Sequence, residues 1–299
     1  MPQIAHHDVS PILGILACPH CRACALAAAS PAELRCRACG SSYQIDDGIP
    51  LLFREGALRD LEHLIKINVD DIPGYQGEDF YVRTGHAKHL VQAIDARDNE
   101  LVLDLGCGHG HVSKWIAASA RVTVVSCDIL LPVLHKVENG IVVASSADDL
   151  AFGDAAFDRV VFTDVMEHIP PEMQDRVLSE IHRVLKPGGR LYVDYPGNKL
   201  PYYSGYQAIN ALYAVLRLFG RNVEYYSMAR EPEAHVNLSF PHRINALFAR
   251  HGFDGRLIPH TTKFFSIARR YRPVAELTNL FPFNHFFAQQ MAGLLVKRP

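Results

Sequence analysis

Four cysteines form two closely spaced pairs near the start of the sequence. Cys18 and Cys21 make one C-x-x-C motif, and Cys36 and Cys39 make a second, with fourteen residues between the pairs. Two such pairs on tight turns place four thiolates at the corners of a tetrahedron, which is the geometry that zinc prefers. We therefore predict a structural zinc site here. Cys24 also lies three residues after Cys21 and is a competing ligand, and a metal-free hairpin with reduced cysteines is the alternative.

A glycine-rich turn follows a short apolar stretch at residues 101–105. The stretch carries one acid, Asp104, and leads into Gly106-Cys107-Gly108-His109-Gly110 and then a helix-forming segment. Glycines this close together let backbone N–H groups approach a ligand at the start of a helix. Such a turn serves nicotinamide dinucleotides and also S-adenosylmethionine, and its G-x-G-x-G spacing alone does not separate the two.

Further polar residues follow the next predicted strands. Asp128 comes directly after the strand at 122–127 and 24 residues after Asp104, a spacing suited to binding two ribose hydroxyls. Ser146 and Asp148 follow the strand at 141–144, where polar groups would meet the edge of an adenine. Because ligands of open α/β sheets bind at the carboxyl ends of the strands, we expect these side chains to surround one ligand.

The elements that position these residues alternate between strand and helix. We predict strands at 101–105, 122–127, 141–144, 157–165 and 190–195, and helices at 112–119, 130–137 and 171–185. Near-continuous apolar strands alternating with helices predict a Rossmann-like α/β fold, with a parallel sheet covered on both faces. The predicted domains are a zinc ribbon at 1–54 and a second domain at 55–299, which contains a cap-like insertion at 196–234.

The segment from Leu101 to Gly197 resembles the class I S-adenosylmethionine-dependent methyltransferases, with a domain like methyltransferase type 11. LDLGCGHG is similar to their first motif, EIHRVLKPGGRLYVDYP to a later one, and HVNLSFPHRINALFARHGF to one near their end. The N-terminal LACPHC and YQIDDGIPLL resemble zinc-ribbon segments found beside methyltransferases. The resemblance implies the class I methyltransferase fold and S-adenosylmethionine as cofactor.

Site residues follow from matching this chain to the family. The resemblance implies that Asp104, Gly106 and Gly108 surround the methionine part of the cofactor and that Asp128 binds its ribose. Arg83 would pair with the methionine carboxylate. Ser146 stands where the family has an aspartate that contacts adenine, so Ser146 or Asp148 would take that role. The predicted cofactor-binding residues are Asp104, Gly106, Cys107, Gly108, Asp128, Ile129, Ser146, Ala147, Asp148, Thr163, Arg83 and Tyr75.

Candidate catalytic residues lie beside the expected methyl group. Methyl transfer needs an oriented acceptor and, for some acceptors, a base to remove its proton. We predict His168, Glu167 and His235 for this work, since a histidine titrates near neutral pH; the alternative is that Glu167 and His168 hold the loop together. Asp164-x-x-Glu167-His168 also resembles the set that binds a divalent metal in some O-methyltransferases, which predicts Mg²⁺ or Mn²⁺ as a further cofactor.

The acceptor remains open at this level. A tyrosine-rich helical stretch within 196–234 favours a small, aromatic or lipophilic acceptor, methylated at oxygen, nitrogen or carbon. One alternative is a ribosomal-RNA guanine methyltransferase of the zinc-ribbon type. Another is a non-catalytic docking partner, with the ribbon as the platform for a second protein.

Bulk composition narrows the class of protein. The 299 residues are 48% hydrophobic and 21% charged, with a formal net charge of −2, so a packed core is expected and nucleic-acid binding is disfavoured. No signal peptide or membrane span is predicted. Paired cysteines outside a secretory context indicate a reducing compartment, so we expect a cytoplasmic protein. The sequence does not fix the oligomeric state.

Overall fold

The structure is a computed structural model of the chain. It describes residues 7–54, 86–138, 140–195, 214–215, 217–218, 220, 239–260 and 290–299. The predicted insertion at 196–234 therefore lies almost wholly outside the described residues. Within the described residues, no helix is long and apolar enough to cross a membrane.

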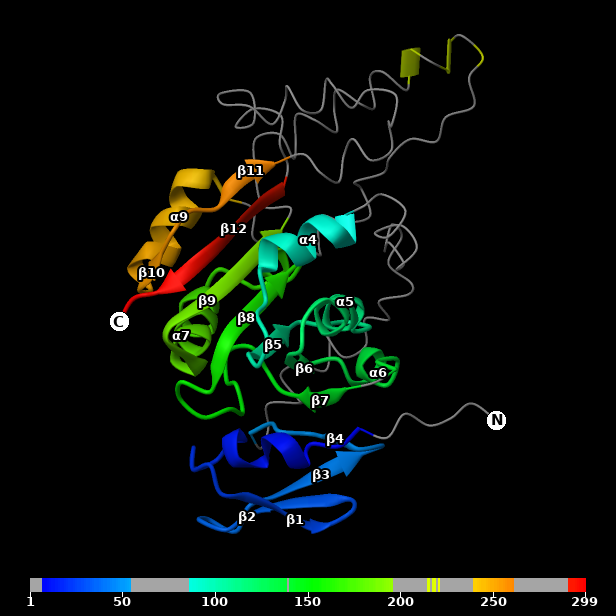
Figure 1. The fold of residues 1–299 in the computed structure, drawn as a ribbon, viewed down its shortest axis with the longest axis vertical. Coiled ribbons are helices and arrows are strands. Elements are labelled where there is room, and N and C mark those ends of the chain that lie inside the picture. Colours follow the sequence, from blue (N-terminus) through cyan, green and yellow to red (C-terminus); the bar gives the residue numbers. More distant parts are fainter. Residues whose placement is uncertain are drawn as a thin grey trace.

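The main body is an eight-stranded sheet with the order β10-β12-β9-β8-β5-β6-β7, and β11 pairs with β12 (Figure 1). Neighbours from β9 to β7 are parallel, and β12 runs antiparallel to β9. The strands are β5 (Leu101–Leu105), β6 (Thr123–Asp128), β7 (Ile141–Ala144), β8 (Phe157–Thr163), β9 (Leu185–Tyr195), β10 (Phe253–Asp254), β11 (Ile258–His260) and β12 (Gln290–Lys297). The strand order reverses between β5 and β8, which is where an open sheet of this kind binds its ligand.

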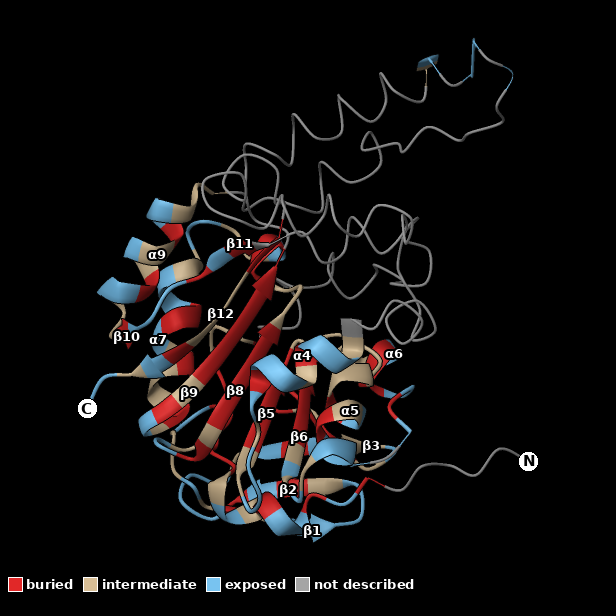
Figure 2. Ribbon diagram, turned by 45° about the horizontal axis from the view of Figure 1, so that its top comes forward, coloured by how far each residue is buried: buried red, intermediate tan, exposed pale blue. Residues whose placement is uncertain are grey.

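Helices cover both faces of this sheet, as the sequence predicts. On one face, Leu90 and Ile94 of α4 and Ile116 of α5 pack with Val102 and Val161. On the other face, α7 and α9 pack against the alternate side chains of the same strands, which are buried in Figure 2. The helices are α4 (His86–Ile94), α5 (His111–Ser119), α6 (Leu131–Leu134), α7 (Gln174–Val184), α9 (Pro241–Arg250) and the 3-10 turn η3 (Met166–His168).

The predicted element boundaries need three corrections. The helix predicted at 130–137 is the single turn α6, and the helix predicted at 171–185 begins at Gln174. The segment 186–189 lies inside β9 instead of separating a helix from a strand. Its glycines allow a bulge, because Gly188 has φ +72° and the β8–β9 register shifts between Phe157 and Arg159.

The N-terminal module is a four-stranded antiparallel sheet with the order β1-β2-β3-β4. It begins with a 3-10 turn that contains the first part of the apolar sequence before Cys18. Its elements are η1 (Ser10–Ile15), β1 (Leu26–Ser30), β2 (Glu33–Cys36), β3 (Ser42–Asp46) and β4 (Ile49–Pro50). In Figure 1 this blue module lies beside β7, the edge strand of the main sheet.

The module and the main sheet share one hydrophobic core. Leu16, Leu34 and Leu52 of the module belong to the same cluster of buried side chains as Phe152 and Phe157 of the main body. The sequence suggested that the sheet has a core of its own, separate from the ribbon, and the structure contradicts this. A module of this size has too little apolar surface to bury internally, so it buries that surface against its neighbour.

Candidate functional site

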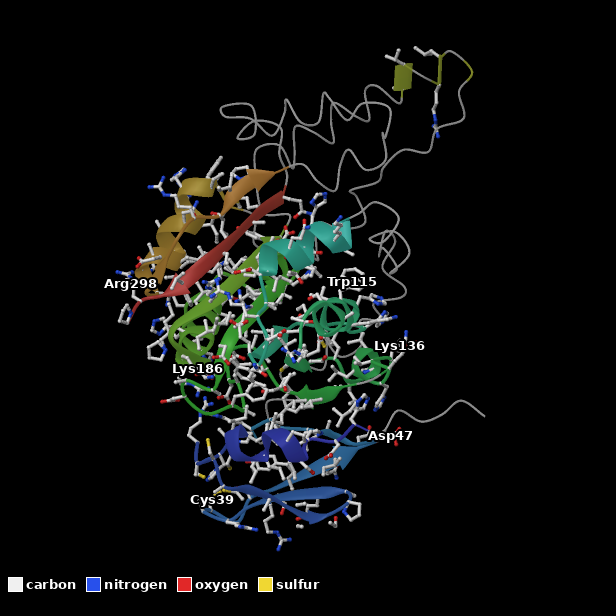
Figure 3. All side chains as sticks on the ribbon, in the orientation of Figure 1. Cys39, Asp47, Trp115, Lys136, Lys186 and Arg298 are labelled. Carbon is white, nitrogen blue, oxygen red and sulfur yellow. The ribbon has the colours of Figure 1, made fainter. Side chains whose placement is uncertain are left out.

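The four paired cysteines come together at the edge of the module. The Sγ atoms of Cys18 and Cys39 are 3.6 Å apart, as are those of Cys21 and Cys36. All four sulfurs lie within 4.8 Å of one another. Figure 3 labels Cys39 at the outer edge of the ribbon. Two knuckles on separate hairpin turns therefore converge on one point.

This thiol cluster fits a zinc ion. Zn–S bonds of about 2.3 Å in a tetrahedron require sulfurs about 3.8 Å apart, close to the distances found here. Hydrogen bonding with Ser41 lowers the pKa of Cys39 to about 6, whereas burial and the neighbouring thiols raise the pKa of Cys21 to about 12. One thiol of the cluster thus ionises readily, and a metal ion would favour the thiolate form of the others. Cys24 lies outside the cluster, and its Sγ is 4.0 Å from the carbonyl oxygen of Ile15. Cys24 is therefore not one of the four converging thiols.

The glycine turn is packed tightly between β5 and α5. The backbone N–H groups of Gly106 and Cys107 both donate to the carbonyl oxygen of Cys127, at 2.8 and 3.1 Å. Gly106 has φ +75°, and a Cβ built on it would lie 2.2 Å from Cγ2 of Val165. Glycine is required here both by the backbone conformation and by the close approach of Val165.

Asp128 lies at the end of β6, directly beside this turn. Its two carboxylate oxygens each accept one backbone hydrogen bond at 3.0 Å, from Gly108 and from Leu130. The backbone of Ile129 contributes a further hydrogen bond. A carboxylate has about four lone-pair positions, so one remains for a ligand. Burial raises the pKa of Asp128, while the backbone bonds lower it in part. Ile129, also a predicted cofactor residue, follows in the chain and is half-buried.

Asp104 is the second buried carboxyl group of the site. It is 1% exposed, and one of its oxygens accepts a hydrogen bond of 2.6 Å from the hydroxyl of Ser113 on α5. Ser113 in turn lies 2.7 Å from the hydroxyl of Ser126. Burial raises the pKa of Asp104 to about 6, and the negative charge of Asp128 contributes to this rise. The site thus holds two carboxylates in an environment that disfavours their charge.

The loop at 145–150 lies against the same strand end. The N–H of Ser145 donates to the carbonyl oxygen of Asp128 at 3.1 Å. The hydroxyl of Ser146 bonds to Asp148, and Asp148 also pairs with Arg176 of α7 at 3.1 Å. Ser146, Ala147 and Asp148 therefore form one turn beside Asp128, where the predicted adenine contacts belong. We call residues 145–150 the β7 loop.

The candidate catalytic pair follows β8. Thr163 ends this strand and is half-buried, while η3 carries Glu167 and His168. Glu167 is buried, and its Oε1 is 3.9 Å from Nε2 of the more exposed His168. His168 also acts electrostatically on Asp128, whose raised pKa it lowers slightly against the effect of burial. The pair therefore lies on the same side of the sheet as the two carboxylates.

The divalent-metal prediction finds no support in this geometry. Over the residues that the structure describes, two groups of potential ligands gather: the four cysteines, and an exposed set made of Asp46, Asp47 and His135. Asp164, Glu167 and His168 do not form such a group.

Three predicted site residues, Tyr75, Arg83 and His235, lie outside the described residues. Conversely, sequence reasoning missed Ser113, the hydroxyl that holds Asp104. A signal was available, since the first turn of the helix after a glycine turn faces the preceding strand end. It also missed Arg22 and Asp149, which are discussed below and which no local pattern connects.

Comparison with known proteins identifies the type of domain. Residues 103–193 match the family described as a methyltransferase domain. Methyltransferase GfsG of Streptomyces halstedii is 29% identical over 116 residues, which cover 36% of this chain and 41% of that protein. Demethylmenaquinone methyltransferase of Beutenbergia cavernae is 36% identical over 107 residues, covering 34% and 43% respectively. The chain thus spans less than half the length of these relatives.

Solved structures show the same fold. Phosphoethanolamine N-methyltransferase 2 of Haemonchus contortus, solved in complex with S-adenosyl-L-methionine, aligns with a TM-score of 0.52 at 15% identity. The alignment covers 84% of this chain and 62% of that one. The predicted Rossmann-like class I methyltransferase fold is therefore confirmed, and residues 103–193 within it match a methyltransferase domain.

Proposed function

We propose that this chain is an S-adenosylmethionine-dependent methyltransferase that acts on a small, aromatic or lipophilic acceptor. The observation that carries the proposal is the pair of carboxyl groups, the buried Asp104 and the half-buried Asp128, at adjacent strand ends on either side of the glycine turn. Their placement, together with the methyltransferase domain match at 103–193, supports a binding site for this cofactor.

The charge of the site fits the cofactor. Across the described segments, no lysine or arginine forms an ion pair with Asp104 or Asp128, and burial raises the pKa of both carboxyls. Buried charges are costly unless an opposite charge or hydrogen bonds compensate them. S-adenosylmethionine carries a sulfonium and an ammonium group, and its ribose donates two hydroxyls. Asp104 would face the cationic methionine part, and Asp128 would accept a hydrogen bond from a ribose hydroxyl at the lone-pair position that the backbone leaves open.

The protein contributes mainly binding and orientation to the proposed reaction. The cofactor supplies a methyl group already activated on a sulfonium, so catalysis is mainly the alignment of the acceptor with that methyl group. Glu167, whose Oε1 lies 3.9 Å from Nε2 of His168, would orient the imidazole. His168 can then take the proton that a hydroxyl or amine acceptor loses. His235 stays a prediction for the same role.

The acceptor class is inferred from the relatives and from the composition. One relative is named for demethylmenaquinone, a lipophilic aromatic acceptor, although it shares only part of its length with this chain. The net charge of −2 does not favour an RNA substrate. We propose a structural zinc on Cys18, Cys21, Cys36 and Cys39, because the thiol cluster has the spacing of a closed tetrahedral site.

The decisive experiment is binding followed by turnover. Isothermal titration of the purified chain with S-adenosylmethionine should give one site, and NAD should give no heat. Transfer of a radiolabelled methyl group to hydroxylated quinones and other aromatic acceptors would then identify the acceptor class. Absence of S-adenosylmethionine binding would contradict the proposal. Labelling of RNA with a steep loss at higher salt would replace the small acceptor with a nucleic acid.

A further inference from the structure

The N-terminal module holds both ends of the β7 loop by backbone pairing. At the start of the loop, the N–H of Leu52 donates to the carbonyl oxygen of Ala144 at 2.9 Å, next to a parallel bridge between Leu51 and Ala144. At its end, the N–H of Ala17 donates to the carbonyl oxygen of Ala151 at 3.0 Å. The six residues of the loop therefore lie between two fixed points supplied by the module.

The middle of the loop is held by two arginines of the same module. Asp149 accepts hydrogen bonds from Arg22 and forms a second ion pair with Arg54, whose Nε lies 2.7 Å from the carboxylate. Arg22 also donates to the carbonyl oxygen of Leu150 at 3.0 Å. The side chain of Asp149 is 13% exposed, whereas those of Arg22 and Arg54 are 36% and 53% exposed, so solvent screens these ion pairs in part.

Arg22 belongs to the first zinc knuckle. It follows Cys21 directly, and its N–H donates to the carbonyl oxygen of Cys18 at 2.8 Å. Its φ of +64° is the left-handed conformation that the knuckle turn imposes. Any change in the geometry of Cys18 and Cys21 must therefore move the backbone from which the Arg22 side chain extends.

Movement of the β7 loop would reach the cofactor site. Ser145 is bonded to the backbone of Asp128, and Ser146 and Asp148 occupy the turn proposed to face adenine. Asp148 and Asp149 are adjacent in this turn, so the position of one carboxylate constrains the other. The physical chain runs from the knuckle through Arg22 to the loop, because the Arg22 side chain pairs with Asp149 and donates to the carbonyl oxygen of Leu150.

We propose that Arg22 is a positioning residue for cofactor binding: it transmits the order of the metal-bound knuckle to the β7 loop through Asp149. This proposal rests on the proposed function. The metal-bound knuckle holds Arg22 in place, Arg22 holds Asp149, and the loop is preorganised for S-adenosylmethionine. The ribbon is thus part of the cofactor site and not a separate accessory module.

The test compares two arginines of the same ribbon. Arg22→Ala removes the contact with Asp149 and keeps a Cβ, so the demand on the backbone is unchanged. Arg35→Ala is the matched control, because Arg35 is exposed and pairs with Glu33 within the ribbon at 3.0 Å. For each variant, zinc is measured by mass spectrometry and the dissociation constant for S-adenosylhomocysteine by calorimetry. Fluorescence of Trp115, the single tryptophan, provides a second measure of binding.

Arg22→Ala should keep its zinc and bind S-adenosylhomocysteine about five- to tenfold more weakly, within the range of coupling between linked sites. Arg35→Ala should bind like the wild type. Asp149→Asn should weaken binding at least as much as Arg22→Ala, because it also weakens the pair with Arg54. The double variant should be little weaker than Asp149→Asn alone, because the Arg22 link is already broken in it. Arg22→Lys, which keeps the charge, should recover part of the affinity, which a loss of packing would not predict.

Two results separate the proposals. If the wild type binds no S-adenosylhomocysteine, the proposed function is wrong. If the wild type binds it and both Arg22→Ala and Asp149→Asn bind equally well, the function stands and the positioning role of Arg22 is overturned. Asp149→Asn decides alone if Arg22→Ala releases zinc, because Asp149 lies outside the knuckle.

Discussion

Two parts of the molecule gather groups that repel one another when charged, and they resolve the repulsion differently. The thiol cluster places four sulfurs within 4.8 Å of one another at the edge of the ribbon, where a metal ion can take the place of four protons. The cofactor end of the sheet places Asp104 beside Asp128, and burial raises the pKa of both. There we propose that a cationic ligand, which binds reversibly, compensates the charge of the two carboxylates.

The difference lies in how each arrangement is built. The thiol cluster depends on two tight turns within 22 residues of sequence, so local spacing specifies it almost completely. The carboxylate pair depends on the pairing of β5 with β6, in which Asp104 lies opposite Ser126 and Leu105 opposite Cys127. A permanent site is local, whereas the reversible site is assembled by the sheet. Contacts of the β7 loop with the ribbon connect the two.

The largest effect is expected from breaking the thiol cluster. Cys36→Ser should release zinc and destabilise the sheet together with the ribbon, because Leu16, Leu34 and Leu52 share a core with Phe152. Structural zinc contributes on the order of 10 kcal/mol of apparent binding energy in small modules, so loss of its ribbon should lower the melting temperature of the whole chain strongly. Metal analysis and thermal unfolding by circular dichroism measure both effects.

Cys24→Ser is the control for this variant. Cys24 is exposed and outside the cluster, so the serine variant should keep its zinc and its melting temperature. Two independent unfolding transitions in the wild type, with the second unchanged in Cys36→Ser, would show that ribbon and sheet are separate after all. Such a result would support the predicted division into two domains at residue 54.

The next largest effect is expected at the glycine turn. Gly106→Ala places a methyl group 2.2 Å from a methyl of Val165 in a backbone with φ +75°. Crowding and the left-handed conformation together should cost about 2–4 kcal/mol of unfolding free energy. Denaturant titration measures this. Gly14→Ala is the matched control, because a Cβ there meets no atom within 4 Å.

Val165→Ala in the Gly106→Ala background should recover the part of the loss that comes from crowding. If the double variant is no more stable than Gly106→Ala, crowding by Val165 is not the reason for the glycine. The strained backbone would then carry the whole cost.

These cases show what the sequence could and could not predict. Apolar runs of four to nine residues predicted β5, β6, β7 and β8 to within two residues, because a strand buried on both faces leaves a continuous apolar signature. The two C-x-x-C motifs predicted the thiol cluster, since a knuckle is specified by its own turn. Asp104 and Asp128 were found as strand-end acids, and their proximity then followed from the parallel sheet.

Long-range contacts were beyond reach for a physical reason. Arg22 and Asp149 are 127 positions apart, and neither stands in a periodic or motif pattern that names the other. The shared core was missed for the same reason, because the apolar residues of the ribbon do not indicate which surface they bury against. Ser113 carries no charge, and its role depends on the direction in which α5 starts.

A smaller effect is expected at the ribose contact proposed for Asp128. Asp128→Asn keeps one carbonyl-type acceptor for Gly108 or Leu130 and removes the charge. Loss of charge-assisted hydrogen bonds to ribose should weaken S-adenosylmethionine binding by about 1–3 kcal/mol. Asp98→Asn is the control, because Asp98 pairs with Arg121 on the surface, away from the site. Equal affinity of both folded variants by calorimetry would exclude Asp128 from the ribose contact.

The smallest effect expected is a pH dependence centred on Asp104. Burial raises the folded pKa of this carboxyl from 3.8 to about 6, so between these values the folded state binds a proton that the unfolded state lacks. Its contribution to the stability of the fold is therefore largest below pH 4 and is lost as the pH rises through about 6.

A cationic cofactor has the opposite preference for the state of Asp104, because it binds the ionised carboxylate. Affinity for S-adenosylmethionine should fall by up to about tenfold from pH 6 to pH 5 while binding releases a proton, as seen by calorimetry in buffers of different ionisation enthalpy. Asp104→Asn should remove this dependence; if it persists, the titrating group is another, with His168 the first to test.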